Sequence, residues 1–283
     1  MTQIKISTIS NLIHTNLNDN YNTREKKHIV DKYLTIKYNV SNTDIILDKQ
    51  ISWNTLQLNK LNRDIHKLNK GIPIQYVIKK EFFYNYIFHV DSGVLIPRPE
   101  TEELVSIVIQ KEKRRERLKI LDVGCGSGCI CITLKKELLN SEVTAIDFSS
   151  KALNISKKNA KLLNANISFH CRNIFQYQTK TKFDIIISNP PYILEQNKDL
   201  IDKSVLKFEP HKALFVENDA LLYYKKILNF ASTHLNKRGR IYFEINSLYK
   251  KDFSKYLYDN FSHIQFKFLK DLQGYDRFLF LKF

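Results

Sequence analysis

The stretch Lys119–Gly128, KILDVGCGSG, joins a short apolar segment to a loop that holds three of the chain's 7 glycines. A strand, a glycine loop and a following helix form the sequence context of a nucleotide-binding turn. Without a Cβ, Gly124 and Gly126 let the backbone approach a ligand closely, and Gly128 permits tight packing of the next helix. The spacing G-x-G-x-G differs from the dinucleotide pattern G-x-G-x-x-G, and no P-loop lysine follows.

From this stretch onward, short apolar segments alternate with segments of helix length. The predicted strands are Lys119–Val123, Glu142–Ile146, Ile167–His170, Phe183–Ser188, Arg240–Ile245, His263–Phe268 and Phe278–Lys282. Helices are expected between them, including Ser149–Leu163 and Ala220–Leu235. The alternation predicts a doubly wound, mostly parallel sheet. No helix separates the last two strands, so we expect them to form an antiparallel hairpin at one edge.

Polar residues at the ends of the second and third strands indicate how a nucleoside would be held. Asp147 follows the glycine loop by about 20 residues, where a carboxylate accepts hydrogen bonds from ribose hydroxyls. After the third strand, Asn173 can contact an adenine amino group through its amide oxygen, and Ile174 can pack on the ring. The sequence therefore predicts a site for a nucleoside cofactor at this edge of the sheet.

The most specific feature is Ser188–Tyr192, SNPPY, at the end of a continuous apolar run. Amide nitrogen is a poor nucleophile because its lone pair is delocalised into the carbonyl. If the Asn189 side-chain oxygen and the Pro190 carbonyl accept its two N–H groups, they stabilise the charge that develops on nitrogen. Pro190 and Pro191 offer no amide hydrogen and fix the loop, while Tyr192 can stack on a flat amide. These residues predict methyl transfer to nitrogen without a metal.

The first 70 residues predict a helical domain. Apolar residues recur at helical spacing in Arg24–Tyr38 and in Ser52–Lys70, with Ser52 as the expected N-cap and Gly71 as the helix end. The apolar stripe of the second segment comprises Trp53, Leu56, Leu61, Ile65 and Leu68. Such a domain serves either as a substrate-recognition module or as a structural bundle, and the sequence leaves both open.

Residues 71–93 change to an aromatic and β-branched pattern, which predicts a β-hairpin that links two domains. The segment LIPRPETE, residues 95–102, then places Pro99 where the first turn of a helix tolerates proline. We expect this helix to run to about Lys113. The catalytic domain is predicted to span residues 94–283.

Composition fits one catalytic domain with a smaller appendage, since 283 residues with 43% hydrophobic side chains can bury a large core. No apolar run of 18 residues and no signal-peptide pattern occur, so a soluble, cytoplasmic protein is expected. A net charge of +16 would attract nucleic acid. However, Lys, Asn, Ile, Tyr and Phe are abundant together, as in AT-biased coding, and the charge alone does not identify a nucleic-acid substrate.

The four cysteines are Cys125, Cys129, Cys131 and Cys171. They form no C-x-x-C pair and have no nearby histidine that could complete a zinc site. We expect all four to be small buried residues rather than metal ligands.

Taken together, the motifs resemble the PrmC/HemK family, the protein-(glutamine-N5) methyltransferases of peptide chain release factors. The resemblance rests on Gly71–Tyr76 (GIPIQY), Glu81-Phe82, Val94–Glu102 (VLIPRPETE), DVGCGSG, Asp147, SNPPY, Phe208–Pro210 with Ala213-Leu214, and Phe243-Glu244. It implies a Rossmann-like class I fold with a seven-stranded sheet, behind a helical domain that helps to hold the release factor. The acceptor would be the glutamine of a Gly-Gly-Gln motif.

The resemblance also assigns residues to the cofactor and the substrate. S-adenosylmethionine, with S-adenosylhomocysteine as product, would be bound by Gly124, Cys125, Gly126, Ser127, Gly128, Asp147, Asn173, Ile174 and Asn189. The glutamine would be gripped by Asn189, Pro190, Pro191 and Tyr192, of which Asn189, Pro190 and Tyr192 are the predicted catalytic residues. The family often carries aspartate at the position of Asn173. A monomer that needs neither metal, membrane nor nucleic acid is expected.

Two other functions compete with this one. Asn-Pro-Pro-Tyr also occurs in adenine-N6 and guanine-N2 methyltransferases of DNA and RNA, and the basic charge fits them. Such enzymes need a groove for the strand that flanks a flipped base, and no separate target-recognition domain follows the catalytic core. A binding protein that has kept only the fold is the other alternative, and the intact Asp147 and SNPPY segment argue against it.

Overall fold

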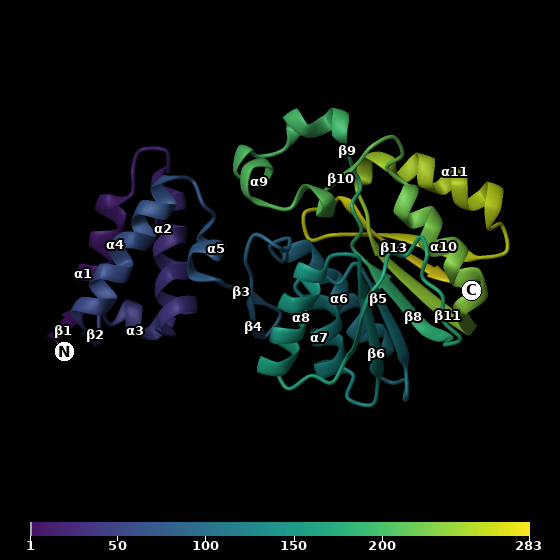
Figure 1. The fold of residues 1–283 in the computed structure, drawn as a ribbon, viewed down its shortest axis with the longest axis horizontal. Coiled ribbons are helices and arrows are strands. Elements are labelled where there is room, and N and C mark those ends of the chain that lie inside the picture. Colours follow the sequence, from purple (N-terminus) through teal and green to yellow (C-terminus); the bar gives the residue numbers. More distant parts are fainter. Residues whose placement is uncertain (1) are drawn as a thin grey trace.

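The computed structural model describes residues 2–283 and shows a helical lobe beside a larger α/β lobe (Figure 1). The sheet of the α/β lobe comprises β5 (Lys119–Val123), β6 (Glu142–Asp147), β7 (Ser168–Cys171), β8 (Phe183–Ser188), β11 (Leu235–Glu244), β12 (Gln265–Lys270) and β13 (Asp276–Lys282). The strand order is β12-β13-β11-β8-β5-β6-β7. Strands β7, β6, β5, β8 and β11 are mutually parallel, and β13 is antiparallel to both of its neighbours. The predicted seven-stranded α/β fold and its antiparallel edge hairpin are confirmed.

Helices cover both faces of this sheet (Figure 1). One face packs on α6 (Pro99–Glu112), α7 (Cys129–Glu137) and α8 (Ser150–Leu162), and the other packs on α10 (Leu222–His234) and α11 (Lys250–Asn260). Along β5, Ile120 enters the first core and Leu121 the second. Because side chains alternate across a strand, a strand buried on both faces is mostly apolar, and in β5 only Asp122 interrupts the buried apolar run.

The glycine loop between β5 and α7 needs backbone conformations that other residues rarely adopt. Gly124, Gly126 and Gly128 have φ angles of 77°, 55° and 83°. A Cβ on Gly128 would lie 2.8 Å from Ile132 Cδ1 and 3.0 Å from Ser156 Cβ, whereas a Cβ on Gly124 or Gly126 would meet no atom within 4 Å. Gly128 therefore allows α7 to approach α8, and the other two glycines border open space.

The helical lobe has a core of its own. Its helices are α1 (Ile6–Asn16), α2 (Thr23–Lys32), α3 (Asn42–Ile46), α4 (Thr55–Asn69) and α5 (Ile74–Ile78), with a π-helical turn at Tyr33–Lys37. The strands β1 (Thr2–Lys5) and β2 (Gln50–Trp53) pair antiparallel beside them.

This pairing corrects the predicted start of the second helix. Ser52 and Trp53 lie in β2, and the N-cap is Asn54, whose side chain accepts from Gln57 N at 2.8 Å in a capping box. Hydrogen bonds to the distant β1 hold these residues extended, so they cannot join the helix. Leu56 is 77% exposed and leaves the predicted stripe, whereas the rest of that stripe is buried. The helix end before Gly71, with φ of 81°, is as predicted.

Of residues 71–93, predicted as a β-hairpin, only the second part forms one, as β3 (Lys80–Phe83) and β4 (Tyr86–His89). The first part forms α5 because its apolar side chains pack in the core of the helical lobe. The hairpin contacts both lobes. Lys32 of α2 forms an ion pair of 2.6 Å with Glu81. The buried side chain of Asn159 in α8 accepts from His89 N at 2.7 Å and donates to the carbonyls of His89 and Ser127 at 2.9 Å. One amide thereby connects the hairpin to the glycine loop.

After SNPPY the chain makes an excursion between the lobes before it returns to the sheet (Figure 1). It contains the short parallel strands β9 (Ile193–Leu194) and β10 (Phe215–Val216), and between them α9 (Lys203–Phe208) with flanking 3₁₀ turns. Phe208 packs in a small core with residues of the linker and of α8. This segment closes one side of the region beyond the strand ends.

The cysteines were expected to be buried, and three of them are. Cys125, Cys129 and Cys131 are buried, and burial raises the pKa of the Cys129 and Cys131 thiols. Cys171 is exposed, contrary to the prediction, because β7 is the edge strand and its last residue faces solvent. Within residues 2–283, no helix combines the length and the apolar character needed to cross a membrane.

We predict that Gly128→Ala lowers the free energy of unfolding by about 3 kcal/mol, since a left-handed alanine is strained and its Cβ overlaps two side chains. Gly274→Ala is the matched control: Gly274 has a similar φ of 88°, and a Cβ there meets no atom within 4 Å. The control should lose about 1 kcal/mol. Urea denaturation measures both, and equal losses would show that crowding between α7 and α8 is unimportant.

Candidate active site

A cavity of about 320 Å³ opens at the carboxyl ends of β5 and β6. Its wall includes Gly124, Cys125, Gly126, Ser127, Asp147 and Phe148. We call it the glycine-loop cavity. A second hollow of about 210 Å³, the NPPY hollow, is lined by Asn189, Pro190, Pro191, Tyr192 and Glu244. Asn189 and Pro191 border both spaces, so the two predicted motifs meet at one place.

Asp147 fixes the shape of the glycine-loop cavity. Its carboxylate accepts from Gly126 N at 2.9 Å and from Ser149 N at 2.8 Å. Burial raises its pKa, and these two backbone donors act in the opposite direction. Each carboxylate oxygen accepts more than one hydrogen bond, so Asp147 can hold the loop and still bind a ligand hydroxyl.

Three of the predicted cofactor residues do not line this cavity in the structure. Gly128 packs against Ile132 and Ser156 instead. Asn173 is exposed, and its side-chain oxygen accepts from Phe175 N at 3.1 Å. Ile174 is buried in the core beneath α10.

Other residues of the cavity wall were missed by sequence reasoning. Phe148 directly follows Asp147 and lines the cavity with 42% of its surface exposed. An aromatic side chain beside the predicted ribose-binding carboxylate was a usable signal for a stacking surface. Thr101, from the first turn of α6, had no such signal, because its place beside Asn189 depends on a contact 88 residues away.

The side-chain amide of Asn189 has a defined direction. Its Nδ2 donates to Thr101 Oγ1 at 3.0 Å, and that hydroxyl donates to Glu244 Oε2 at 2.6 Å. The oxygen Oδ1 is thereby left on the opposite side, and no described residue donates to it. A ligand amide with N–H groups would find an acceptor there.

Tyr192 closes the NPPY hollow. Its hydroxyl lies 3.5 Å from Glu244 Oε1, and burial raises the pKa of the phenol, so it stays neutral. The preceding Pro190 and Pro191 have no N–H groups to compete for an incoming amide. The hollow therefore presents acceptors and a flat apolar ring.

Arg98 borders both spaces and forms an ion pair with a residue behind it. Arg98 Nη2 lies 2.6 Å from Glu209 Oε1, and Glu209 Oε2 accepts from Ile96 N at 3.1 Å. Glu209 is buried, so its charge is stabilised by these two donors. The contact joins the LIPRPETE segment to the excursion after SNPPY, 111 residues away.

Comparisons with known proteins agree with this geometry. Residues 100–271 match the family described as Methyltransferase small domain. The release factor glutamine methyltransferase of Flavobacterium psychrophilum is 42% identical over 252 residues, which cover 87% of this chain and 88% of that protein. The protein of the same name from Bacteroides thetaiotaomicron is 36% identical and aligns over 97% of this chain and 99% of its own length.

A solved structure supports the fold independently. The Thermus thermophilus 16S rRNA N2 G1207 methyltransferase, in complex with AdoMet and guanosine, superposes with a TM-score of 0.53. The superposition covers 72% of this chain and 49% of the neighbour's chain. The sequences are 19% identical, so the similarity concerns the fold alone. With a sheet of this order, both motifs at its carboxyl edge and relatives that match nearly end to end, the chain belongs to the release factor glutamine methyltransferase family within the methyltransferase small-domain group.

Proposed function

We propose that the protein transfers a methyl group from S-adenosylmethionine to the side-chain amide nitrogen, N5, of the glutamine in the Gly-Gly-Gln motif of peptide chain release factors. The observation that carries the proposal is the direction of Asn189. Because its Nδ2 donates to Thr101, its amide oxygen is left to accept an amide N–H group of a ligand where the two hollows meet. The names of the relatives supply the release factor as the partner.

The glycine-loop cavity suits the cofactor. Gly124 and Gly126 leave room for a ligand against their backbone, and the Asp147 carboxylate can accept from ribose hydroxyls. Phe148 offers an aromatic surface beside them. When bound, S-adenosylmethionine supplies an electrophilic methyl group on a sulfonium. We propose that Cys125 and Ser127, which lie in the cavity wall, also contact the cofactor. Gly128, Asn173 and Ile174 lie outside that wall and would act by shaping the loops.

The NPPY hollow would bind and activate the glutamine amide. We propose that Asn189 Oδ1 and the Pro190 carbonyl each accept one N–H group of the substrate. Nitrogen would form a bond to the methyl carbon as the methyl–sulfur bond breaks, and it would then lose one proton to solvent. During the attack its N–H groups become more positive, and acceptors fixed before the reaction stabilise that change. Tyr192 would stack on the amide plane and exclude water, while Pro191 holds the loop. No covalent intermediate on the protein is needed.

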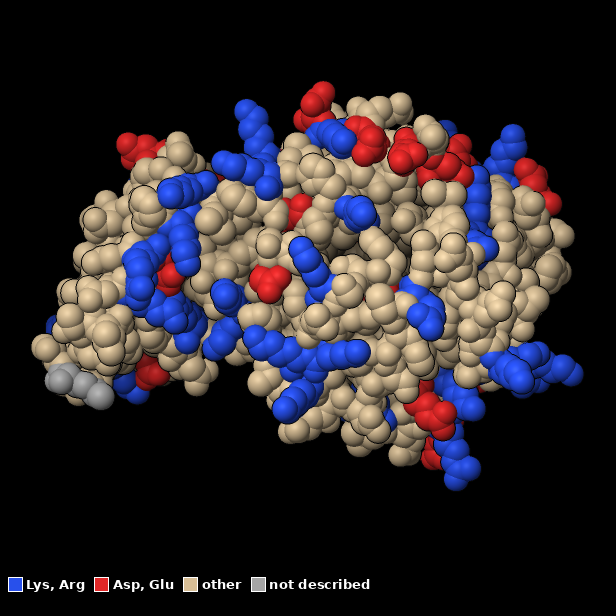
Figure 2. Space-filling view, viewed as in Figure 1, with Lys and Arg blue, Asp and Glu red and all other residues tan. Residues whose placement is uncertain are grey.

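The helical lobe is proposed to help hold the release factor. Residues 1–70, together with α5 that packs in the same core, would form the recognition domain, the β3–β4 hairpin the linker, and residues 94–283 the catalytic domain. Lys and Arg side chains gather where the two lobes meet on the face seen in Figure 2. A protein substrate held at that junction would place one glutamine at the NPPY hollow. We further propose a cytoplasmic monomer that requires neither a metal nor nucleic acid.

Methylation of a nucleic-acid base is the less favoured alternative. It shares the Asn-Pro-Pro-Tyr motif and fits the charge of +16. The relatives that match most of the chain are named for release factor glutamine, and that favours a protein substrate.

Incubation of the purified protein with S-adenosylmethionine and a release factor should add one methyl group to the glutamine of Gly-Gly-Gln. Mass spectrometry of the proteolytic peptide identifies the modified residue. A release factor with Gly-Gly-Glu in place of the motif is the control and should stay unmodified. An unmodified Gly-Gly-Gln peptide, with cofactor binding demonstrated, would contradict the proposed substrate.

Asn189→Ala should reduce turnover roughly 10²- to 10³-fold because one preorganised polar contact is lost. Binding of S-adenosylhomocysteine, measured by isothermal titration calorimetry, should change little. Near-normal turnover by this variant would remove Asn189 from the mechanism.

Asp147→Ala should show the reverse pattern, weakening S-adenosylhomocysteine binding roughly ten- to hundredfold since hydrogen bonds to a carboxylate are lost. Asp184→Ala is the matched control: its carboxylate also accepts a backbone N–H, from Lys119 at 2.8 Å, but at the amino ends of the strands. The control should bind the cofactor product normally. If both variants lose affinity equally, general destabilisation rather than ribose binding explains the effect.

A further inference from the structure

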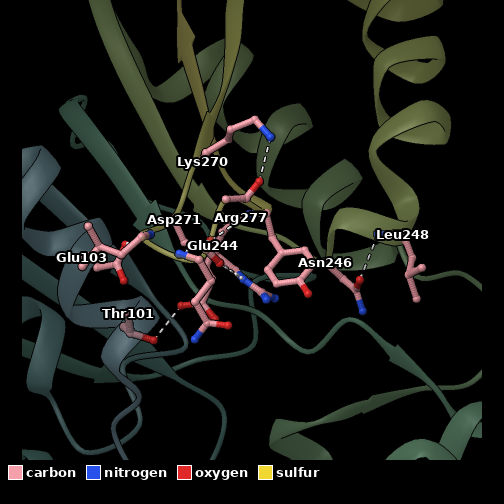
Figure 3. Close-up of polar contacts among 12 residues, drawn as sticks. Thr101, Glu103, Glu244, Asn246, Leu248, Lys270, Asp271 and Arg277 are labelled. Carbon is pink, nitrogen blue, oxygen red and sulfur yellow. Dashed lines mark hydrogen bonds and ion pairs between the residues drawn. The ribbon is translucent and has the colours of Figure 1, made fainter.

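A chain of hydrogen bonds runs behind Asn189 and joins elements that are distant in the sequence. Asn189 follows β8, Thr101 lies in the first turn of α6, and Glu244 is the last residue of β11. Figure 3 shows the Thr101 hydroxyl directed at the Glu244 carboxylate. Thr101 is 4% exposed and Glu244 is 3% exposed, so both ends of this hydrogen bond are buried.

These hydrogen bonds all donate in the same direction, from Asn189 to Thr101 and from Thr101 to Glu244. A threonine hydroxyl carries a single hydrogen, and Thr101 gives it to the carboxylate of Glu244. Toward Asn189 the same oxygen can only accept, so the asparagine must present its NH₂ group. The two ends of a side-chain amide are nearly equal in size, and packing alone does not distinguish them. The charge on Glu244 therefore decides which end of Asn189 faces the ligand.

The direction matters for the reaction. A glutamine amide also has two ends, an oxygen and an NH₂ group. With Oδ1 outward, Asn189 binds the NH₂ end and places nitrogen at the reacting position. With Nδ2 outward it would bind the carbonyl oxygen, and the nitrogen would point away. We infer that Thr101 and Glu244 are positioning residues that act through Asn189 by fixing its amide oxygen toward the substrate nitrogen. This inference rests on the proposed glutamine substrate.

The surroundings of Glu244 determine when it carries its charge. The titratable and charged groups that face it are Glu100 on α6, Tyr192 after β8, Tyr224 on α10 and Arg277 on β13. Burial raises the pKa of Glu244 to about 7, the bonds from Thr101 and Tyr192 and the charge of Arg277 act downward, and Glu100 acts upward. Asp271 holds Arg277 in place through an ion pair of 3.2 Å (Figure 3).

A double-mutant cycle tests the inference. Thr101→Val keeps the shape but removes the hydroxyl, and kcat should fall about tenfold, as expected for one hydrogen bond, with little change in KM. Thr101→Ser restores the hydroxyl and should restore kcat. In an Asn189→Ala background, Thr101→Val should have no further effect, because there is no amide left to orient. A tenfold loss that persists in that background would overturn the inference and assign Thr101 a structural role.

A second measurement does not depend on activity. In protein labelled with ¹⁵N-asparagine, the side-chain NH₂ signal of Asn189 is identified by its loss in Asn189→Ala. Thr101→Val should shift that signal and Thr101→Ser should leave it close to the wild-type position. An unchanged signal in Thr101→Val would overturn the inference even if the release factor proves not to be the substrate. Absence of methylation by the wild-type protein, with the expected shifts, would instead contradict only the proposed function.

The pH dependence of kcat supplies a third test. Below about pH 7, protonated Glu244 can donate to Thr101, whose hydrogen then turns toward Asn189 and favours the reversed amide. The kcat of the wild-type protein should therefore decline as the pH falls from 8 to 6. Glu244→Gln, which does not titrate, and Asn189→Ala should both lack this decline. The same acid limb in either variant would overturn the role of Glu244.

Discussion

The two hydrogen bonds that Asp147 accepts from the backbone of Gly126 and Ser149 hold the glycine loop against the carboxyl edge of the sheet. They join the end of β6 to the loop after β5 and to the start of α8. The two N–H donors offset the free-energy cost of burying the carboxylate. The carboxylate in turn restrains a loop whose three glycines are otherwise conformationally free. These two hydrogen bonds therefore determine the shape of the cavity, because the glycines that border it have no side chains.

The NPPY hollow is built on a different principle. Its backbone is fixed by two prolines, and its polarity is fixed by side chains that arrive from α6 and β11. In the proposed reaction, acceptors held in this way would be in place before the substrate arrives. The two hollows share Asn189 and Pro191, so the cofactor and the amide would meet along the edge where β5 and β8 are neighbours.

Long-range polar contacts keep these parts together. Asn159 connects the linker hairpin to the glycine loop, and the Arg98–Glu209 pair connects the LIPRPETE segment to the excursion after SNPPY. Both Asn159 and Glu209 are buried, so the loss of a partner would leave a polar group without compensation. Segments that are far apart in the sequence are thereby held together around the two hollows.

The sequence by itself determined the elements whose signals are local. β5 and β8 occupy the predicted residues, the sheet has its seven strands, and the motif loops follow the strands as expected, because alternation, glycine spacing and paired prolines act over a few residues. Only the tertiary structure decided the rest. Asn54 rather than Ser52 is the N-cap, because Ser52 pairs with β1. Cys171 is exposed because β7 is an edge strand. The direction of the Asn189 amide depends on Glu244, which reaches it through a threonine 143 residues away in the chain. Such contacts arise from the packing of α6 against β11, and no local pattern encodes which hydroxyl will face which carboxylate.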